Sequence, residues 1–155
     1  MEIMSQAIAY GLPEKNKQII QGGTKMQTIK FSVPLRIGVS KTKTVPMNMN
    51  WYRNAHYRTS NAAKIKFSDE INIPELDVPL AACKITFVFY YGSARRQDID
   101  NSLSVIAKFT QDSLVAAKVI LDDDYTIVRQ VTGIYGGLDR KNPRCEVIVE
   151  ELNVS

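Results

Sequence analysis

The sequence predicts one domain of the α/β (α+β) class: a mixed β-sheet of about four or five strands, covered by two main helices. Two observations lead to this prediction. The chain has 155 residues, 45% of them apolar, which is enough for a single domain to bury a core. Segments with the two-residue alternation typical of strands are also interspersed with segments whose apolar residues recur every three or four positions, as in helices.

Residues 1–25 precede the first clear element. They have mixed polarity and no sustained period, so we expect a loosely ordered N-terminal extension, with the folded domain spanning residues 26–155. Met26 is a candidate native start, because residues 21–25 could be encoded by a purine-rich, ribosome-binding-like run just before an ATG codon. The nucleotide sequence tests this hypothesis, since a different codon choice at positions 22 and 23 would contradict it.

Four segments predict strands: residues 27–35, 81–91, 126–135 and 144–151. The second is apolar on both of its sides, which predicts a central position in the sheet. The last two are separated by residues 136–143, rich in glycine and polar residues, and this pattern predicts a hairpin. A first helix is expected over residues 54–71, with Ala62, Ile65 and Ile71 facing inward.

The second helix is predicted after Asp100. Its expected buried face consists of Leu103, Ile106, Ala107, Thr110, Leu114 and Ala117. Asn101, Lys108 and Asp112 fall at intervals of seven and four and so share another line along the helix. Because helical side chains lean toward the helix start, Lys108 is expected to point back toward Asp98 and Asp100.

Charge is distributed unevenly along the chain. The net charge is +4, but residues 1–97 carry +8 and residues 98–155 carry −4. Between Lys15 and Ser68 there are eleven Lys or Arg residues and no acidic residue, a pattern typical of proteins that bind polyanions. A basic face that is merely solvated remains the alternative interpretation.

Two clusters of carboxylates flank the second helix. Asp98 and Asp100 are two residues apart, so on an extended backbone they project to the same side, and two adjacent like charges favour a bound cation. Mg²⁺ prefers such oxygen ligands and leaves its remaining positions to water and phosphate. The triplet at residues 122–124 supplies further carboxylates.

These residues resemble the RusA-type Holliday junction resolvases, the crossover junction endodeoxyribonucleases common in phages and prophages. The family pattern is Asp-x-Asp-Asn, a helix with a lysine four residues before an aspartate, and then paired aspartates. The chain has this order at residues 98–101, 108–112 and 122–123. It departs in one place, because Ser104 stands three residues after Asn101, where the type member has its lysine.

The resemblance implies a RusA-like fold and hydrolysis of DNA phosphodiesters that resolves Holliday junctions and related branched DNA during recombination, repair or phage DNA processing. The resemblance implies that the catalytic residues are Asp98, Asp100, Asp123 and Lys108. It implies that the metal ligands are Asp98, Asp100, Asp123 and Asp122. The implied cofactor is Mg²⁺, with Mn²⁺ as a substitute, and the implied partners are four-way DNA and a second copy in a homodimer.

Basic residues near this motif are candidate DNA contacts. Arg95 and Arg96 adjoin the carboxylates, and the other candidates are Arg53, Arg58, Lys64 and Lys66. His56, the sole histidine, is expected to contact phosphate or lie on the surface. Trp51, Tyr52 and Tyr57 could stack on unpaired bases, although packing roles are favoured.

The remaining expectations concern location and alternative functions. Since no apolar run approaches about 18 residues and no signal peptide pattern occurs, we expect a cytoplasmic protein with no membrane partner. The resemblance implies a bacterial host and a phage or prophage origin. Asp112 is expected to pair with Lys108, Asn101 to bond a backbone amide near the helix start, and residues 122–124 could form only a turn. The alternative function is a non-catalytic branched-DNA or RNA binding protein on the same fold.

Overall fold

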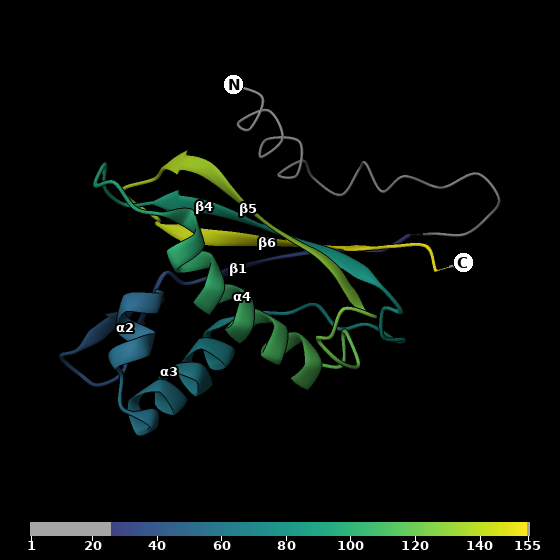
Figure 1. The fold of residues 1–155 in the computed structure, drawn as a ribbon, viewed down its shortest axis with the longest axis horizontal. Coiled ribbons are helices and arrows are strands. Elements are labelled where there is room, and N and C mark those ends of the chain that lie inside the picture. The colour runs from purple at the N-terminus through teal and green to yellow at the C-terminus, as the bar shows by residue number, and fades with distance from the viewer. Residues whose placement is uncertain (1–25, 155) are drawn as a thin grey trace.

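A computed structural model of the chain describes residues 26–154 as a mixed four-stranded sheet with three helices on one side of it (Figure 1). The sheet contains β1 (Thr28–Val33), β4 (Cys83–Tyr91), β5 (Val128–Leu138) and β6 (Arg144–Glu151), in the order β1-β6-β4-β5. The helices are α2 (Met49–Asn54), α3 (Tyr57–Glu70) and α4 (Ile99–Ala116). The expected mixed α/β architecture is therefore confirmed, whereas the expectation for residues 1–25 lies outside the described residues.

Strand β4 is central, as its sequence predicts. It pairs in parallel with β5 and antiparallel with β6, and only two of its nine residues, Lys84 and Tyr90, are not buried. Hydrophobic side chains on both sides of a strand are stabilised only when both of its faces are covered. The sheet core therefore forms around β4.

The predicted hairpin between the last two strands is wrong, because β4 lies between β5 and β6. Helix α4 carries the chain from the end of β4 to the start of β5, and such a crossover joins parallel strands. Residues 139–143 then cross the end of β4 to reach its other edge. The Asp139 amide donates to the Tyr91 carbonyl at 2.8 Å as the chain passes.

The predicted helix over residues 54–71 is confirmed as α3, which begins at Tyr57, whereas the short helix α2 before it was not predicted. Asn48 caps α2 by accepting a hydrogen bond from the Trp51 amide at 3.0 Å, and His56 caps α3 by accepting one from the Arg58 amide at 3.2 Å. The buried face of α3 is not the one that was predicted. The buried residues of α3 are Ala63 and Phe67, whereas Ala62 is exposed and Ile65 is 63% exposed, so both of those predictions are wrong. Ile71, just after the helix, is buried as expected.

Two small strands were also not predicted. Strands β2 (Arg36–Gly38) and β3 (Thr44–Pro46) pair antiparallel in a second sheet. Each has only three residues, too few to display an alternating pattern. Met47, directly after β3, donates its amide to the Leu35 carbonyl at 2.9 Å and is buried, so this small hairpin joins the main core.

Helix α4 packs between the sheet and the other two helices. Ile106, Ala107, Thr110 and Leu114 are buried as predicted, but Ala117 is exposed. The start of the helix lies very close to β5: a Cβ added at Gly133 would lie 2.8 Å from Ile99 Cγ2 and 3.0 Å from Leu103 Cδ2. Only glycine, which has no Cβ, allows α4 to approach β5 this closely. In the described part of the chain no helix is long and apolar enough to cross a bilayer.

Candidate functional site

Four of the candidate site residues, Arg95, Arg96, Asp98 and Asp100, lie where β4 ends and α4 begins, a junction at the left of Figure 1. Residues 92–98 connect these two elements. Because β5 runs parallel to β4, the carboxyl ends of both strands lie at the same edge of the sheet. Ligands commonly bind outside this edge in α/β sheets, so the fold places the first acidic cluster in a favourable position.

Asp98 is the N-cap residue of α4, but its side chain makes no capping hydrogen bond. A carboxylate at this position normally accepts from an amide two or three residues further on. Asp98 and Asp100 are both exposed, and neither forms an ion pair within residues 26–154. The positive end of the helix dipole favours negative charge here. Both carboxylates therefore have oxygens available to a cation or a donor.

A pocket of about 280 Å³ lies at the same end of the sheet, lined by Gln97 and Ile99, the sequence neighbours of Asp98, but not by Asp98 or Asp100. Its lining includes Tyr91, Arg95, Arg96, Tyr135 and Leu138. Both arginines are exposed, and they make no ion pair with any described residue. Guanidinium groups with free donors are well suited to phosphate oxygens. The pocket therefore combines positive charge with an aromatic wall.

The aromatic wall is a stack of three rings. Phe89 and Tyr91 lie 5.9 Å apart between ring centroids at an interplanar angle of 13°, and Tyr91 and Tyr135 lie 6.2 Å apart at 20°. Tyr135 ends the stack and is 41% exposed. Base stacking on such an exposed ring is a common way of holding unpaired nucleotides.

Tyr91 brings an unsatisfied polar atom to the pocket wall. Its hydroxyl is buried and makes no hydrogen bond of normal geometry within the described residues, although the Ser102 side chain is close enough to lower the pKa of the phenol. Burial has the larger effect and raises the pKa of Tyr91, and the negative charge of Asp98 acts in the same direction. The hydroxyl therefore stays protonated and can donate to a ligand.

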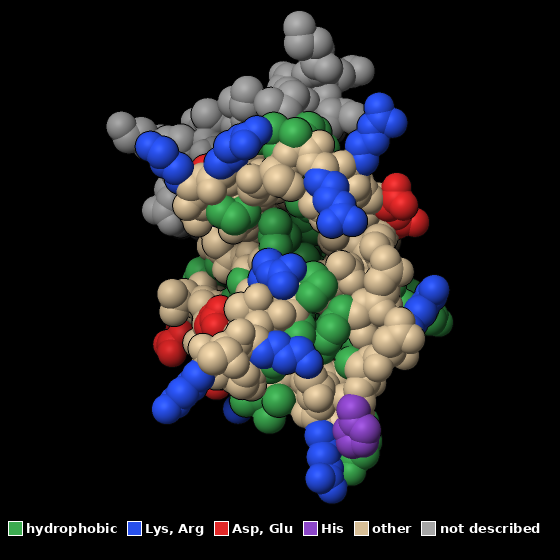
Figure 2. Space-filling view, turned by 90° about the vertical axis from the view of Figure 1, so that its left-hand side faces the viewer, with side chains coloured by type: hydrophobic (Ala, Val, Ile, Leu, Met, Phe, Trp, Pro, Cys, Tyr) green, Lys and Arg blue, Asp and Glu red, His purple; other side chains and the backbone are tan. Residues whose placement is uncertain are grey.

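Figure 2 views this end of the molecule. Lys and Arg side chains gather on the face, and hydrophobic surface is visible in the hollow between them. Arg53 in α2, and Arg58 and Lys66 in α3, are exposed, as expected of DNA contacts. Tyr57 is also exposed, with the Arg58 guanidinium 5.8 Å from its ring centroid, whereas Tyr52 packs edge-on against Phe109. The favoured packing role of Tyr52 is thus confirmed.

Three polar residues of α4 have distinct roles. Asp112 pairs with Lys64 of α3 at 2.7 Å, so its expected pairing with Lys108 is wrong, because the half-buried carboxylate faces α3. Lys64 is accordingly engaged within the protein. Asn101 accepts a hydrogen bond at 3.0 Å from the Met49 amide, which joins the starts of α4 and α2. Lys108 is exposed and has no ion-pair partner among residues 26–154.

The second acidic cluster forms a turn between α4 and β5. The Asp124 carboxylate accepts from the Thr126 amide at 2.8 Å and also from its hydroxyl, and these hydrogen bonds lower the pKa of Asp124. Asp122 accepts from the Asp123 amide at 2.8 Å. The interpretation of this triplet as a turn is therefore confirmed for Asp124, while the Asp123 side chain has no hydrogen bond or ion pair among the described residues.

The two acidic clusters lie at opposite ends of α4 (Figure 1). This helix has 18 residues, so it is about 27 Å long. Ile120 forms a bridge with Leu80, just before β4, whereas Asp98 follows the other end of that strand. Within residues 26–154 no group of three or more His, Cys, Asp or Glu residues is placed to hold one metal ion. The expected convergence of Asp98, Asp100, Asp122 and Asp123 is therefore not found within one chain.

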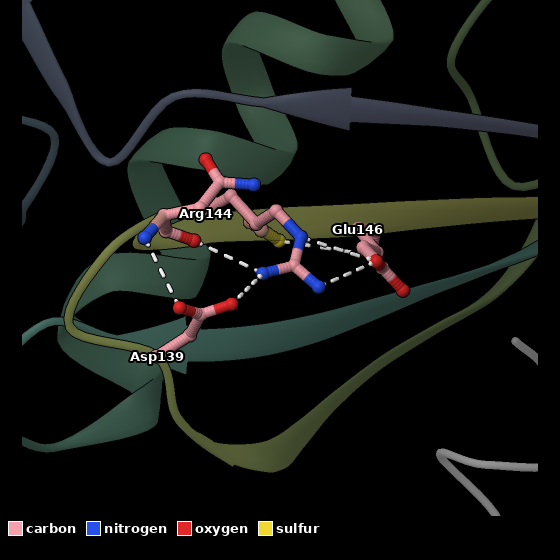
Figure 3. Close-up of polar contacts among 5 residues, drawn as sticks. Asp139, Arg144 and Glu146 are labelled. Atoms are coloured by element: carbon pink, nitrogen blue, oxygen red, sulfur yellow. Dashed lines mark hydrogen bonds and ion pairs between the residues drawn. The ribbon is translucent and has the colours of Figure 1, made fainter.

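A separate ion cluster stabilises this edge of the sheet (Figure 3). Arg144 donates to Asp139 at 2.9 Å and to Glu146 at 3.0 Å, and its guanidinium carbon lies 4.3 Å from the centroid of the Tyr90 ring. Asp139 also accepts from the Asn142 amide, and this bond is the main reason why the pKa of Asp139 is lowered. The cluster fixes residues 139–143 across the end of β4.

No family model matches the chain, and no curated protein matches it either. The resemblance to RusA-type resolvases therefore rests on the layout of about residues 27–151 and on the motifs within residues 98–124, and it stays a prediction. The reasoning from sequence also missed Tyr91, Tyr135 and Leu138 as pocket residues. Recognising that β4 and β5 are parallel would have revealed them, because parallel strands bring their carboxyl ends to one edge.

Proposed function

We propose that the chain is a divalent-metal-dependent endodeoxyribonuclease that resolves Holliday junctions and related branched DNA. The observation that carries this proposal is the pair of exposed carboxylates at the start of α4, Asp98 and Asp100, next to Arg95 and Arg96. None of the four side chains forms an ion pair within residues 26–154. Acids alone would repel DNA, but acids next to arginines suit a metal-bridged phosphate. The resemblance to RusA-type resolvases supplies the reaction.

Asp98 and Asp100 fit Mg²⁺ or its substitute Mn²⁺, since Mg²⁺ usually takes one or two carboxylates and fills its other positions with water and phosphate. A metal bound there lowers the pKa of a bound water and offsets charge on the phosphoryl oxygens. Arg95 and Arg96 hold the phosphate backbone by charge-assisted hydrogen bonds. Lys108, two turns along α4, adds positive charge near the reacting phosphate.

Asp122 and Asp123 enter the proposal through a second copy of the chain. The length of α4 keeps them away from Asp98 and Asp100 of their own chain. The proposed homodimer would bring the turn after α4 of one copy beside the start of α4 in the other. Asp123 of one copy then meets Asp98 of its partner copy, so that dimerisation completes the metal site.

Cleavage of a synthetic four-way junction tests the proposed reaction. We expect cutting with Mg²⁺ or Mn²⁺, none with EDTA, and much slower cutting of a linear duplex of the same sequence. A wild-type chain that binds the junction but leaves it uncut with both metals would contradict the nuclease proposal.

Mixing two inactive variants tests the shared site. We expect Asp98→Asn and Asp123→Asn each to be inactive alone. After their subunits are exchanged in equal amounts, about a quarter of all sites should combine an intact Asp98 with an intact Asp123 and recover cutting. Without any recovery the site does not form between copies, and full activity of Asp123→Asn alone would leave Asp98 and Asp100 as the only required carboxylates.

A non-catalytic branched-DNA or RNA binding protein is the second candidate. The observation in its favour is that residues 26–154 of one chain contain no group of three potential metal ligands. This candidate shares the arginines and the aromatic wall with the first. It predicts junction or RNA binding that EDTA leaves unchanged, with no strand cutting under any metal.

The resemblance also indicates a biological setting. Since RusA-type resolvases are common in phages and prophages, we place the chain in the cytoplasm of a bacterial host, where recombination, repair and phage DNA processing create branched DNA. Complementation of a bacterial strain that lacks junction resolvase activity tests this placement, with the Asp100→Asn variant as the inactive control.

A further inference from the structure

We infer that the pocket beside the start of α4 binds a single unpaired nucleotide, with its base stacked on Tyr135 and its phosphate held by Arg95 and Arg96. The inference deepens the proposed function by naming the part of branched DNA that this site recognises, and it rests on that function only in taking DNA as the ligand. It applies equally to a catalytic and to a purely binding protein.

The size of the pocket favours one nucleotide. Its volume is about 280 Å³. Pockets for drug-sized ligands have about 300–1,000 Å³, so this one is slightly smaller than that range. A single planar base is of a size to occupy it. The pocket volume therefore favours one unpaired base, such as those at a branch point or in a single strand.

The aromatic stack favours a base over other planar groups. Tyr135 lies on Tyr91 and Tyr91 lies on Phe89, and the two inner rings are buried. This support holds the Tyr135 ring in one orientation while it remains 41% exposed. Stacking of a base on Tyr135 costs the protein little conformational entropy, because the aromatic wall is already ordered.

The Tyr91 hydroxyl is a polar atom of the pocket wall whose own hydrogen bonding is weak. Tyr91 is only 7% exposed and lines the pocket, and within the described residues its hydroxyl makes no hydrogen bond of normal geometry, although the Ser102 side chain lies close enough to lower the pKa of the phenol. Buried polar atoms are nearly always satisfied, and exceptions often mark functional positions. A base edge has both carbonyl and ring nitrogen acceptors, which suit a protonated phenol.

The charges around the pocket orient the nucleotide. Arg95 and Arg96 precede α4 and make no ion pair with described residues. Asp98 follows them as the N-cap residue of α4. The phosphate is therefore expected on the arginine side, and a metal on Asp98 would attract the next phosphate of the strand. An acidic peptide could use the arginines but has no planar group to match the stack.

The test measures how the full-length chain binds a short single strand that carries one 2-aminopurine, in EDTA to prevent cutting. Stacking should quench the 2-aminopurine fluorescence. We expect Tyr135→Ala to weaken this binding at least tenfold and to abolish the quenching, while binding of a blunt duplex changes less than twofold. Tyr135→Phe should bind like the wild type, because it retains the ring.

Controls separate this inference from misfolding and from the nuclease proposal. Tyr125→Ala removes another exposed tyrosine, in the turn after α4, and should have no effect. If Tyr135→Ala is unfolded by circular dichroism, Tyr135→Leu replaces it, because leucine keeps a large apolar side chain without the aromatic ring, and the same loss is expected. Unchanged single-strand binding by the folded variant overturns the inference even where junction cutting is seen, as does displacement of the strand by polyglutamate at equal charge concentration.

Discussion

The two ends of α4 use aspartate in opposite ways. At its start, Asp98 occupies the N-cap position without making the cap hydrogen bond, and Asp100 is exposed and unpaired. At its end, Asp124 holds the turn into β5 through two hydrogen bonds to Thr126. The first cluster has free oxygens next to arginines, and the second has part of its capacity engaged in folding.

This difference in hydrogen-bond partners, more than residue type or spacing, is what we use to choose between candidate functional and structural carboxylates. Asp139, at the pocket end of the molecule, is another carboxylate with a structural role. It lies near the candidate site in the fold, but Arg144 and the Asn142 amide occupy its oxygens. Unsatisfied carboxylates are therefore the ones on which we base function.

The largest expected effect is on the rate of junction cutting, when a carboxylate at the start of α4 is replaced by a neutral amide. Asp100→Asn should lower the rate of junction cutting by at least about 10²-fold, because a metal ligand is lost beside the developing charge. Junction affinity measured in EDTA should stay within about twofold of the wild type. Asp124→Asn is the matched control and should cut at nearly the wild-type rate. Equal loss of cutting in both variants would remove the distinction between the two ends.

Neutralising the arginines should weaken DNA binding and its salt dependence. Each phosphate contact contributes about 0.9 to the slope of log affinity against log salt, so Arg95→Gln/Arg96→Gln should reduce that slope by up to about 1.8. The measurement is a filter-binding titration at several salt concentrations. Lys118→Asn, at the other end of α4, is the control, since Lys118 has φ 59° and Asn tolerates this conformation. A similar loss of slope in that control would indicate diffuse rather than local charge binding.

The Arg144 cluster should affect stability without affecting function. Arg144→Ala leaves Asp139 and Glu146 without their shared partner and removes the stacking on Tyr90, so we expect the free energy of unfolding to fall by about 1–3 kcal/mol. Urea denaturation measures this change. Cutting at a temperature where the variant is folded should be unchanged, and a specific loss of cutting there would place Arg144 in the functional site.

The smallest effect concerns acid stability at the end of α4. Hydrogen bonds from Thr126 lower the pKa of Asp124 in the folded state, so its ionised form stabilises folding above the unfolded pKa, about 3.9. That contribution is lost as pH falls through the lower folded pKa. Thermal unfolding between about pH 5 and pH 2 should show a steeper decline for the wild type than for Asp124→Asn. Parallel curves would mean that the turn does not depend on the charge.

Local patterns predicted much of the fold. Long periodic segments were identified correctly, because the positions of the apolar residues within β4 and α4 match the positions that are buried. The pairing of strands was not predicted correctly. The alternation of apolar and polar residues in residues 126–135 is the same whether that strand pairs with β4 or with β6. Short elements such as α2 have no buried residues of their own and therefore no period to read.

The candidate site was predicted in part for the same reason. Asp98, Asp100, Arg95 and Arg96 are neighbours in sequence, so their proximity needed no knowledge of topology. Tyr135 joins them only through the parallel pairing of β4 with β5. Asp112 likewise finds Lys64 across a helix interface that no intrahelical spacing shows. Contacts between distant segments were the part that the sequence alone did not provide.

The most direct test of the central claim is a Mn²⁺ titration of the isotope-labelled chain followed by NMR, because a bound paramagnetic ion broadens only nearby amides. The account predicts that broadening begins at residues 97–101 and is lost in Asp98→Asn/Asp100→Asn. If the homodimer completes the site, residues 122–123 broaden at the same Mn²⁺ concentration. Broadening confined to residues 122–124, or spread evenly over all acidic residues, would contradict a metal site at the start of α4.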